Sequence, residues 1–506
     1  MDARRRIIGG FVSGSSGGVI EPIDTDDYLT IYALENGLMA SLSNNACEYC
    51  IDGDGNWLSL DAGATTQSIN NGQRLSFRGE LTPSGITGIG TFTISKRCNL
   101  EGNCMSMLFG DDAADNLSLS NKKYAFIKLF YQCSNIVNVS ENFLPATTIS
   151  DSCYSNMFNG CSNLTSAPTL PATTMANGCY QNMFSGCTKL TIAPVLPATT
   201  LAPSCYLSMF NGCTSLTSAP ALPATTLISM CYNSMFMNCT SLTAAPALPA
   251  TTLISRCYEQ MFYGCTSLTT APTLPATTLA DYCYYNMFYG CTSLTSVPTL
   301  PATTLADSCY YGMFQNCSSL TAAPELPATT LAGSCYRNMF RNCTNLTTAP
   351  ELLATTLVSL CYFCMFQDCT KLNYIKMLAT DVSASNCLGY WVNNVASSGT
   401  FVKDPNMTSL PTGADGIPEG WIVVNEGDSE SSITDNYLTI YALEDGLTAS
   451  LSTNACEYCV DGDGNWKSLA ADTVTESINA GHRLSFRGEL TPAEYTGIGT
   501  FTISKR

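Results

Sequence analysis

The most regular feature of the sequence is a pattern of apolar and polar positions that returns every 26 residues. One unit runs from Leu300 to Glu325, and its opening Leu-Pro-Ala-Thr-Thr motif returns at Leu326. A fixed period of this length indicates a stack of supersecondary units, because a single unit cannot bury its own apolar face. The marker proline recurs at positions 145, 171, 197, 223, 249, 275, 301 and 327, and Leu353 replaces it in the ninth copy.

Within a unit, the apolar spacing predicts a short helix followed by a short strand. Over Ala306–Phe314, the side chains of Cys309 and Met313 can share one helical face with Phe314. The next segment, Ser-Leu-Thr-Ala-Ala, ends at a proline and predicts a strand whose Leu320 points inward. The unit therefore predicts a mixed α/β solenoid.

The segment from Met287 to Pro301 contains Phe-Tyr-Gly-Cys-Thr-Ser-Leu and ends on Leu-Pro. In this it resembles the BspA-like leucine-rich repeats of gut Bacteroides-type bacteria and their phages. The resemblance covers roughly residues 124–380 and implies a leucine-rich-repeat solenoid that serves adhesion or ligand binding. The chain departs from the common pattern through its Cys-Tyr pair, as at Cys309 and Tyr310, and through an added proline.

The array is flanked by two copies of another segment. Residues 26–97 and 435–506 match at a constant offset of 409 without insertion. Their short alternating runs and frequent turn signals predict small all-β sandwiches of Ig-like type. Whether the natural chain continues into a second array stays open. The expected segments are a leader or anchor over 1–24, a β-sandwich over 25–110, the solenoid over 124–377, a C-terminal cap over 378–425, a linker over 426–434 and the second sandwich copy over 435–506.

Charge narrows the classes of partner. The formal net charge is -18, which argues against nucleic acid, because such binding needs a basic face, and against an anionic membrane surface. No run of about 18 consecutive apolar residues is present, so we expect no membrane insertion. We expect the partner to be a host cell-surface glycan or protein instead.

The cysteines of the array favour packing over cross-linking. Of 27 cysteines, most fall in two series eight residues apart within each unit, and residues that far apart on a helix cannot form a disulfide. Bridges between neighbouring units stay geometrically possible. Free, buried thiols acting as small apolar side chains fit assembly in a reducing cytoplasm.

Four cysteines of the first flank form a separate group. Cys47 and Cys50 together with Cys98 and Cys104 could supply four thiolates to zinc, form disulfides or serve only as core residues. Two residues stand between the first pair, and their strand-like alternation suggests that both thiols share one sheet face. We favour a structural role and expect no metal and no cofactor.

Catalytic motifs are missing from the sequence. Asp52-Gly-Asp54-Gly-Asn56 superficially resembles a calcium loop, but Trp57 and Gly63 stand where such a loop needs glycine and glutamate, so a hairpin turn is the simpler interpretation. His482 is the one histidine, and the array has neither a Ser–His nor a Cys–His pair. We therefore expect a protein that is not an enzyme.

The best candidate for a binding surface comes from positions that vary between repeat copies. Tyr282, Tyr285 and Tyr289 stand at helical spacing on one face, and stacking of units extends that face. An exposed aromatic patch could stack on a glycan or anchor a protein. Tolerated surface tyrosine in a tyrosine-rich repeat is the plainer alternative. The candidate residues are Tyr263, Tyr282, Tyr285, Tyr289, Tyr311, Arg337 and Arg341.

Together these features predict a phage virion accessory or receptor-binding protein of fibre-like type, assembled in the host cytoplasm. The short Arg-rich leader would contact other virion proteins, and homo-oligomers are possible. The alternative is a BspA-like adhesin at the bacterial cell surface.

Overall fold

The chain divides into two compact units, Met1–Leu320 and Thr321–Arg506. The expected leader and linker fall almost entirely outside the described residues. In this computed structural model the described residues are 23–407, 410–426, 438–443, 445–452, 454–460, 466–488 and 500–504.

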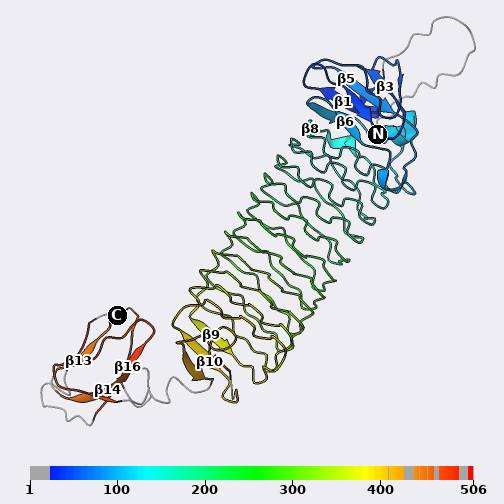
Figure 1. Ribbon diagram of the computed structural model, residues 1–506. Helices are drawn as coiled ribbons and strands as arrows, with labels where there is room; N and C mark the ends of the chain where they lie inside the picture. The colour runs from blue at the N-terminus through cyan, green and yellow to red at the C-terminus, as the bar shows by residue number, and fades with distance from the viewer. Residues whose placement is uncertain are drawn as a thin grey trace, which may run out of the picture. The chain divides into compact units, whose positions relative to one another are not determined.

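The first flanking segment consists mainly of short strands. Five of them, joined by β8 from the start of the array, form one sheet in the order β4-β3-β5-β1-β7-β8, and β2 pairs with β6 in a second sheet (Figure 1). The ring of Phe77 on β5 meets that of Phe92 on β6 at 5.1 Å, so aromatic side chains pack between the sheets. The Ig-like assignment stays a prediction. The strands are β1 (Leu29–Ala33), β2 (Ala40–Leu42), β3 (Cys47–Ile51), β4 (Leu58–Leu60), β5 (Arg74–Arg78), β6 (Phe92–Ile94), β7 (Cys98–Glu101) and β8 (Ile136–Val139).

Short helical elements surround these strands. Most are single 3-10 turns, and α1 is one α-helical turn that follows β7. The elements are η1 (Thr25–Asp27), η2 (Gly85–Thr87), α1 (Ser106–Phe109), η3 (Gly110–Asp115) and η4 (Glu141–Phe143).

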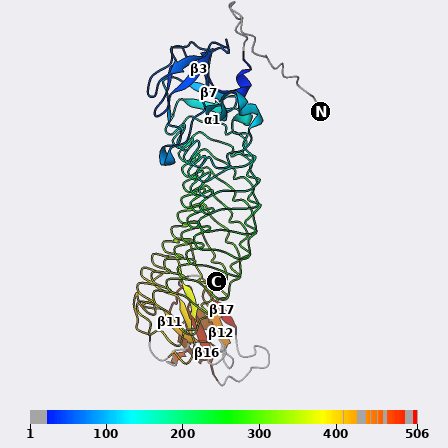
Figure 2. The ribbon, with the colours of Figure 1, turned by 90° about the vertical axis from the view of Figure 1, so that its right-hand side faces the viewer.

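The helix predicted within each repeat is wrong. The segment Ala306–Phe314 forms consecutive turns, and the same holds for its equivalents in the described array. Figures 1 and 2 show the coils as thin irregular ribbons. The error has a simple cause: apolar side chains four residues apart fit one face of a helix, and they fit a chain of overlapping turns equally well.

Hydrogen bonds define these turns. The amide of Met287 donates to the carbonyl of Tyr284 at 3.2 Å and closes a turn within the coil. The next amide, that of Phe288, donates to the carbonyl of Met313 in the following coil at 2.9 Å. The amides therefore alternate: one closes a turn within its own coil, and the next bonds to the following coil. Both kinds of buried backbone N–H group thus have an acceptor.

Every fourth residue of a turn segment has a positive φ. In one coil these are Tyr282 at 58°, Asn286 at 50° and Gly290 at 70°. A positive φ at the third residue is typical of a type II turn, and it disfavours most side chains. Glycine, asparagine and serine accordingly occupy most of these positions in the array.

The predicted strand is reduced to one parallel bridge per coil. Ala244 pairs with Thr270, and Thr270 pairs in turn with Ser296. Leu320, predicted to point inward, is fully buried, as that prediction required.

Two columns of aromatic rings run through the interior of the first unit. Phe262 and Phe288 stack with centroids 5.7 Å apart, and Tyr258 and Tyr284 stack at 5.9 Å. Their planes lie within 10° of parallel, because each coil repeats the backbone of the one before it. The phenylalanine column comprises Phe130, Phe158, Phe184, Phe210, Phe236, Phe262, Phe288 and Phe314.

Cysteines complete this core. The thiol of Cys291 donates to the carbonyl of Phe262 in the preceding coil at 3.2 Å, and Cys265 makes the same contact with Phe236 at 3.1 Å. All described cysteines are buried, and none of them forms a disulfide. A thiol suits this position because it is small and apolar and can still donate a hydrogen bond to a backbone carbonyl.

The first flanking segment covers the start of the array. Phe92 of β6 stacks on Phe130 at 5.5 Å, and the thiol of Cys133 donates to the Phe92 carbonyl at 2.9 Å. These are the contacts that one coil makes with the next, so β6 takes the place of a coil. At Gly88 a Cβ atom would lie 2.7 Å from the carbonyl oxygen of Tyr124, which is why only glycine allows this close approach.

The second unit ends its coils on a small parallel sheet. Its order is β11-β10-β9, with β9 at Tyr374–Met377, β10 at Thr400–Lys403 and β11 at Ile422–Asn425. Trp391 is fully buried, stacks on Tyr362 at 6.5 Å and donates from Nε1 to the carbonyl of Gly416 at 2.8 Å.

The second flanking copy repeats the strands of the first. Its main sheet has the order β12-β16-β14-β15, and β13 pairs with β17. The strands are β12 (Leu438–Tyr441), β13 (Ala449–Leu451), β14 (Cys456–Val460), β15 (Lys467–Leu469), β16 (Arg483–Arg487) and β17 (Phe501–Ile503).

Replacing Phe288 by alanine should destabilise the array strongly. The ring is fully buried and stacks on both neighbours, so its removal leaves a cavity and should cost roughly 3–5 kcal/mol. Urea unfolding followed by circular dichroism would measure the loss. Ser296→Ala, an exposed change in the same coil, should alter stability by less than about 0.5 kcal/mol. Equal effects of both changes would contradict the assigned core.

Candidate binding surface on the repeat coils

The turn segments sort their side chains into buried and partly exposed positions. Tyr284 and Phe288 are buried, whereas the residues that follow each of them, Tyr285 and Tyr289, are partly exposed. These outward positions recur every 26 residues, so two columns of variable side chains run along the coils. The predicted aromatic residues do share a surface, although turns rather than a helix place them there.

Neighbouring coils pair the outward tyrosines. Tyr263 and Tyr289 stack with centroids 4.4 Å apart and planes 2° from parallel. Tyr285 and Tyr311 stack at 4.6 Å and 20°. Tyr282 meets Tyr285 at 5.8 Å with tilted planes. The stacked pair of Tyr263 and Tyr289 and the group of Tyr282, Tyr285 and Tyr311 are together called the tyrosine surface here.

This stacking decides which parts of the rings a ligand can reach. Two parallel rings at 4.4 Å cover each other's facing sides, which leaves edges and phenol groups for a ligand. Partial burial raises the pKa of Tyr263, and the charge and hydrogen bond of Tyr289 raise it further. The phenol of Tyr263 therefore stays protonated at neutral pH and can donate as well as accept hydrogen bonds.

An ion pair supports one side of the tyrosine surface. The guanidinium of Arg256 lies 4.4 Å from the ring centre of Tyr282, and its NH1 atom pairs with Glu259 at 3.0 Å. Glu259 also accepts from the side chain of Asn233 at 2.9 Å. The Glu259 side chain is only 13% exposed, so these contacts hold the arginine beneath Tyr282 more firmly than a solvated pair would.

The two predicted arginines belong to the second unit. Arg337 lies over the ring of Phe363 with 4.8 Å between guanidinium and ring centre. Arg341 is partly exposed in the same turn segment. Their role in binding stays a prediction.

Sequence reasoning missed Arg256, Glu259 and Phe363. The 26-residue step does place Arg256 one period before Tyr282 and Phe363 one period after Arg337. The step alone does not give the side-chain conformations that bring each guanidinium over its ring.

The cysteine group of the first flank differs from the expected arrangement. Residues three apart on a strand point to opposite faces, and Cys47 and Cys50 lie on the regular strand β3, so the prediction that they share one face is wrong. Burial raises the pKa of Cys47 to about 12 and that of Cys50 to about 11, which keeps both thiols protonated. Among the described residues, no group of three or more His, Cys, Asp or Glu is placed to hold a metal ion.

The acidic Asp52–Asn56 segment is a turn between β3 and β4, as predicted. Asp52 accepts from the backbone amide of Arg74 at 2.8 Å and from the side chain of Gln73 at 2.7 Å. The Asp52 carboxylate therefore links the end of β3 to the start of β5 through these hydrogen bonds. Trp57 packs on Tyr28, with ring centres 5.0 Å apart.

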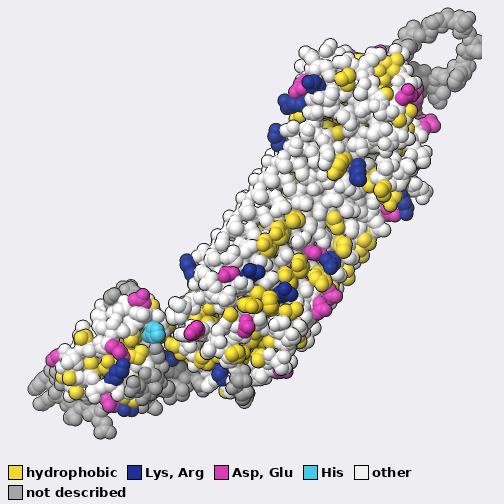
Figure 3. Space-filling view, in the orientation of Figure 1, with side chains coloured by type: hydrophobic (Ala, Val, Ile, Leu, Met, Phe, Trp, Pro, Cys, Tyr) yellow, Lys and Arg dark blue, Asp and Glu magenta, His cyan; other side chains and the backbone are white. Residues whose placement is uncertain are grey.

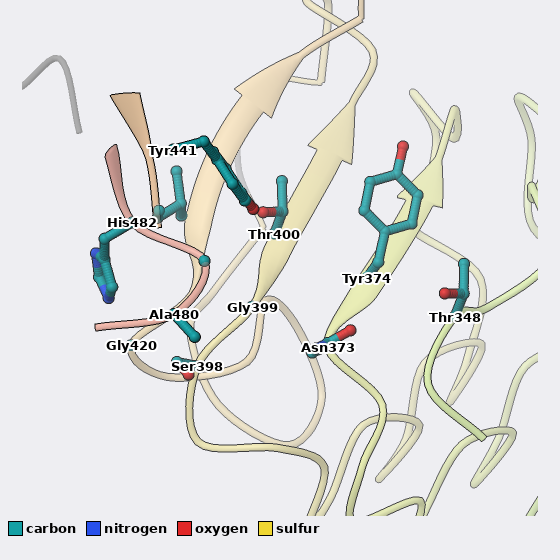
Figure 4. Close-up of a pocket in the computed structure, with 12 residues that line it drawn as sticks. Thr348, Asn373, Tyr374, Ser398, Gly399, Thr400, Gly420, Tyr441, Ala480 and His482 are labelled. Atoms are coloured by element: carbon teal, nitrogen blue, oxygen red, sulfur yellow. The ribbon is translucent and has the colours of Figure 1, made fainter. Parts of the chain in front are cut away.

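A cleft of about 310 Å³ lies in the second unit (Figure 4). One part of its lining is a row of side chains from successive coils, Thr348, Tyr374 and Thr400, and another part contains Tyr441 and His482. No Asp, Glu, Lys or Arg is among its lining residues.

The visible surface of the coils is mostly uncharged. Figure 3 shows scattered Lys, Arg, Asp and Glu side chains among a majority of polar uncharged and apolar ones. Electrostatic steering of a charged ligand is weak on such a surface, so shape and hydrogen bonding must select what binds. Among the described residues, no helix has both the length and the apolar character needed to cross a membrane.

The coils repeat every 26 residues, bond to one another through their backbones and share a core of leucine, phenylalanine and cysteine. These features define a repeat protein of the leucine-rich class. The family described as "BspA type Leucine rich repeat region (6 copies)" matches residues 113–243, 181–321 and 257–387. The matches together span more than half of the sequence, and the chain belongs to this family.

Other comparisons add little. No curated protein matches the chain. A solved structure titled "Crystal structure of TLR13-ssRNA13 complex" is similar at 12% identity and a TM-score of 0.22. The similarity covers 59% of this chain and 48% of that one, and at this TM-score it supports no argument about fold or ligand.

The buried thiols predict that alkaline pH destabilises the protein. Burial raises the pKa of Cys257, Cys283 and Cys317 from an ordinary 9 to about 12. Above pH 9 the unfolded chain loses thiol protons that the folded chain retains, so stability is full below about pH 9 and falls as pH rises towards 12. Each such thiol adds a slope of about 1.4 kcal/mol per pH unit.

Urea unfolding under reducing conditions at pH 8, 9, 10 and 10.5 would measure this fall. A chain with Cys257→Ala and Cys283→Ala should show a shallower dependence on pH than the unchanged chain. Constant stability up to pH 10.5 would show that the thiols are not buried as described.

Proposed function

We propose that the chain is a non-enzymatic attachment protein whose repeat coils display the tyrosine surface to a host cell-surface glycan or protein. The observation that carries this proposal is the concentration of five tyrosines at outward, variable positions of three neighbouring coils. Membership of the BspA-type family also supports a binding role.

The geometry of the rings favours a ligand rich in hydroxyl or amide groups. Stacked pairs present phenol groups and ring edges, and the spacing of about one coil repeats those groups at regular intervals. Tyrosine suits such a surface because a rigid ring contributes contact area at little entropic cost while its hydroxyl forms directed hydrogen bonds. A glycan or an extended peptide could span the two pairs.

A double change of Tyr285 and Tyr289 to alanine should abolish most of the attachment. It removes one ring from each stacked pair, and losses of tenfold or more are typical when central aromatic anchors are truncated. Binding to host cells and to glycan arrays would be measured with the full chain.

The matched control is Gln181→Ala with Ser185→Ala, because these residues occupy the same two columns in an earlier coil. The control should bind as the unchanged chain does. Undiminished binding by the tyrosine variant, with its circular dichroism unchanged, would remove the tyrosine surface as the site.

We further propose that this attachment protein is a virion component of a phage, in the manner of a fibre or accessory protein assembled in the host cytoplasm. The support is that the described cysteines are buried and form no disulfide, which suits a reducing compartment. Contact with other virion proteins through the N-terminal segment and homo-oligomerisation belong to this proposal. A BspA-like adhesin at the bacterial surface is the alternative, favoured by the family itself.

Counting free thiols tests the compartment. Protein purified under alkylating conditions and then denatured should expose close to 27 reactive thiols per chain, because oxidation is not expected in the cytoplasm. A largely oxidised chain would contradict cytoplasmic assembly and favour the adhesin. Mass spectrometry of purified virions from the phage's host would then decide whether the chain is part of the particle.

A further inference from the structure

Tyr263 and Tyr289 lie much closer together than the tyrosines of the buried column. Their ring centroids are 4.4 Å apart, against 5.9 Å for Tyr258 and Tyr284. The planes of Tyr263 and Tyr289 are within 2° of parallel, and their phenol groups are hydrogen-bonded to each other. Parallel planes and adjoining phenol groups together mean that each ring lies over the other in the same orientation. Equivalent carbon atoms of the two rings therefore face one another.

Exposure to solvent separates the two kinds of tyrosine in the same way. Tyr263 and Tyr289 are partly exposed at outward positions, whereas Tyr258 and Tyr284 are only 1% exposed. The buried rings are also held on both sides, since Tyr284 stacks on Tyr258 and on Tyr310. An oxidant dissolved in water therefore reaches the outward pair and not the buried column, and the outward rings have more room to turn.

Two facing phenols are the reactants of oxidative coupling. When a phenol loses one electron and its hydroxyl proton, it becomes a phenoxyl radical whose unpaired electron is shared by the oxygen and by the ortho and para ring carbons. In tyrosine the para carbon carries the rest of the side chain, so the Cε atoms beside the hydroxyl are the carbons that couple. The hydrogen bond between the phenols of Tyr263 and Tyr289 lets a hydrogen atom pass between them, so oxidation of either ring involves the pair.

We propose that Tyr263 and Tyr289 are an oxidative modification site, at which a covalent dityrosine bond joins Cε atoms of neighbouring coils. The oxidant is hydrogen peroxide, activated by a haem peroxidase. Each phenol gives up one electron and its hydroxyl proton, and the two radicals combine to form the Cε–Cε bond. The hydrogen on each bonded Cε then leaves as a proton while each oxygen takes one up, which restores both aromatic rings and both hydroxyls. In total the chain loses two electrons and two protons, which reduce one hydrogen peroxide to two waters.

The distance between the rings suits this bond. Two directly bonded phenyl rings have their centroids about as far apart as those of Tyr263 and Tyr289. Coupling therefore requires these rings to turn from face-to-face to edge-to-edge, but it does not require the coils to move together. The buried pair of Tyr258 and Tyr284, at 5.9 Å, would have to draw together coils whose backbones are already hydrogen-bonded in register. Selectivity for the outward pair thus follows from distance as well as from access.

Tyr285 and Tyr311 form a second, less favourable pair. Their centroids are 4.6 Å apart and their planes lie 20° from parallel, so their Cε atoms face each other less directly. Tyr282 lies 5.8 Å from Tyr285 with its plane tilted by 52°, which is outside the geometry for coupling. The structure therefore ranks the two stacked outward pairs above Tyr282 and above the buried column.

The bond would change the stability of the array without removing its polar groups. It closes a covalent loop of one repeat unit, and a cross-link of this kind, like a disulfide, stabilises a fold mainly by restricting the unfolded chain. Both hydroxyls remain, so the tyrosine surface keeps its hydrogen-bonding groups.

The test treats the full chain, at high dilution, with a haem peroxidase and hydrogen peroxide, and then maps the monomeric fraction by proteolysis and mass spectrometry. A peptide pair joined at Tyr263 and Tyr289 should appear, lighter than the two separate peptides by two hydrogen atoms, together with dityrosine fluorescence. The pair joined at Tyr285 and Tyr311 should appear in lower yield. Absence of dityrosine within single chains, or equal yields from other tyrosines of the chain, overturns the proposal.

Matched variants separate this site from general oxidation. Tyr289→Phe keeps a ring in the stack but has no hydroxyl to oxidise, so it should abolish the first cross-link and lower the fluorescence of the monomeric fraction by more than half. Tyr282→Phe, the same change in the same coil, should leave both cross-links in place. Undiminished fluorescence of Tyr289→Phe also overturns the proposal. Mapping of the unchanged chain needs no variant, and none of these results depends on whether the tyrosine surface binds a host ligand.

Discussion

The structure depends on one constraint: every second amide of a turn segment must find its acceptor in the next coil. The contact between the amide of Phe288 and the carbonyl of Met313 is one case, and it requires the two backbones to follow the same path. Identical paths place identical side chains above one another. The aromatic columns, the thiol-to-carbonyl bonds and the paired surface tyrosines all result from this register.

The same constraint explains how far the sequence could predict the fold. The 26-residue step showed the stack and the buried positions of Met287, Phe288 and Leu294, because these depend on periodicity alone. It did not separate a helix from a chain of turns, since both repeat nearly every four residues. The positive φ at Asn286 and Gly290 makes the difference, and the recurring Asn and Gly at these positions were the available signal.

For the binding surface, the sequence predicted which side chains point outward, but it did not predict their contacts with charged side chains. Tyr263 and Tyr289 stand one period apart in the sequence, and their stacking follows from the coil register. The support of Tyr282 by Arg256 and Glu259 depends on side-chain conformations within and between coils, which no spacing rule gives.

Equivalence of the coils also affects how such a chain can change over generations. A coil contacts its neighbours through the same residues wherever it stands, so the gain or loss of a whole 26-residue unit leaves every remaining interface intact. Recombination between repeats can then lengthen or shorten the array without a folding penalty at the junction. The variable outward columns would be reshuffled by the same events, so new recognition surfaces can arise from exchange of units as well as from point mutation.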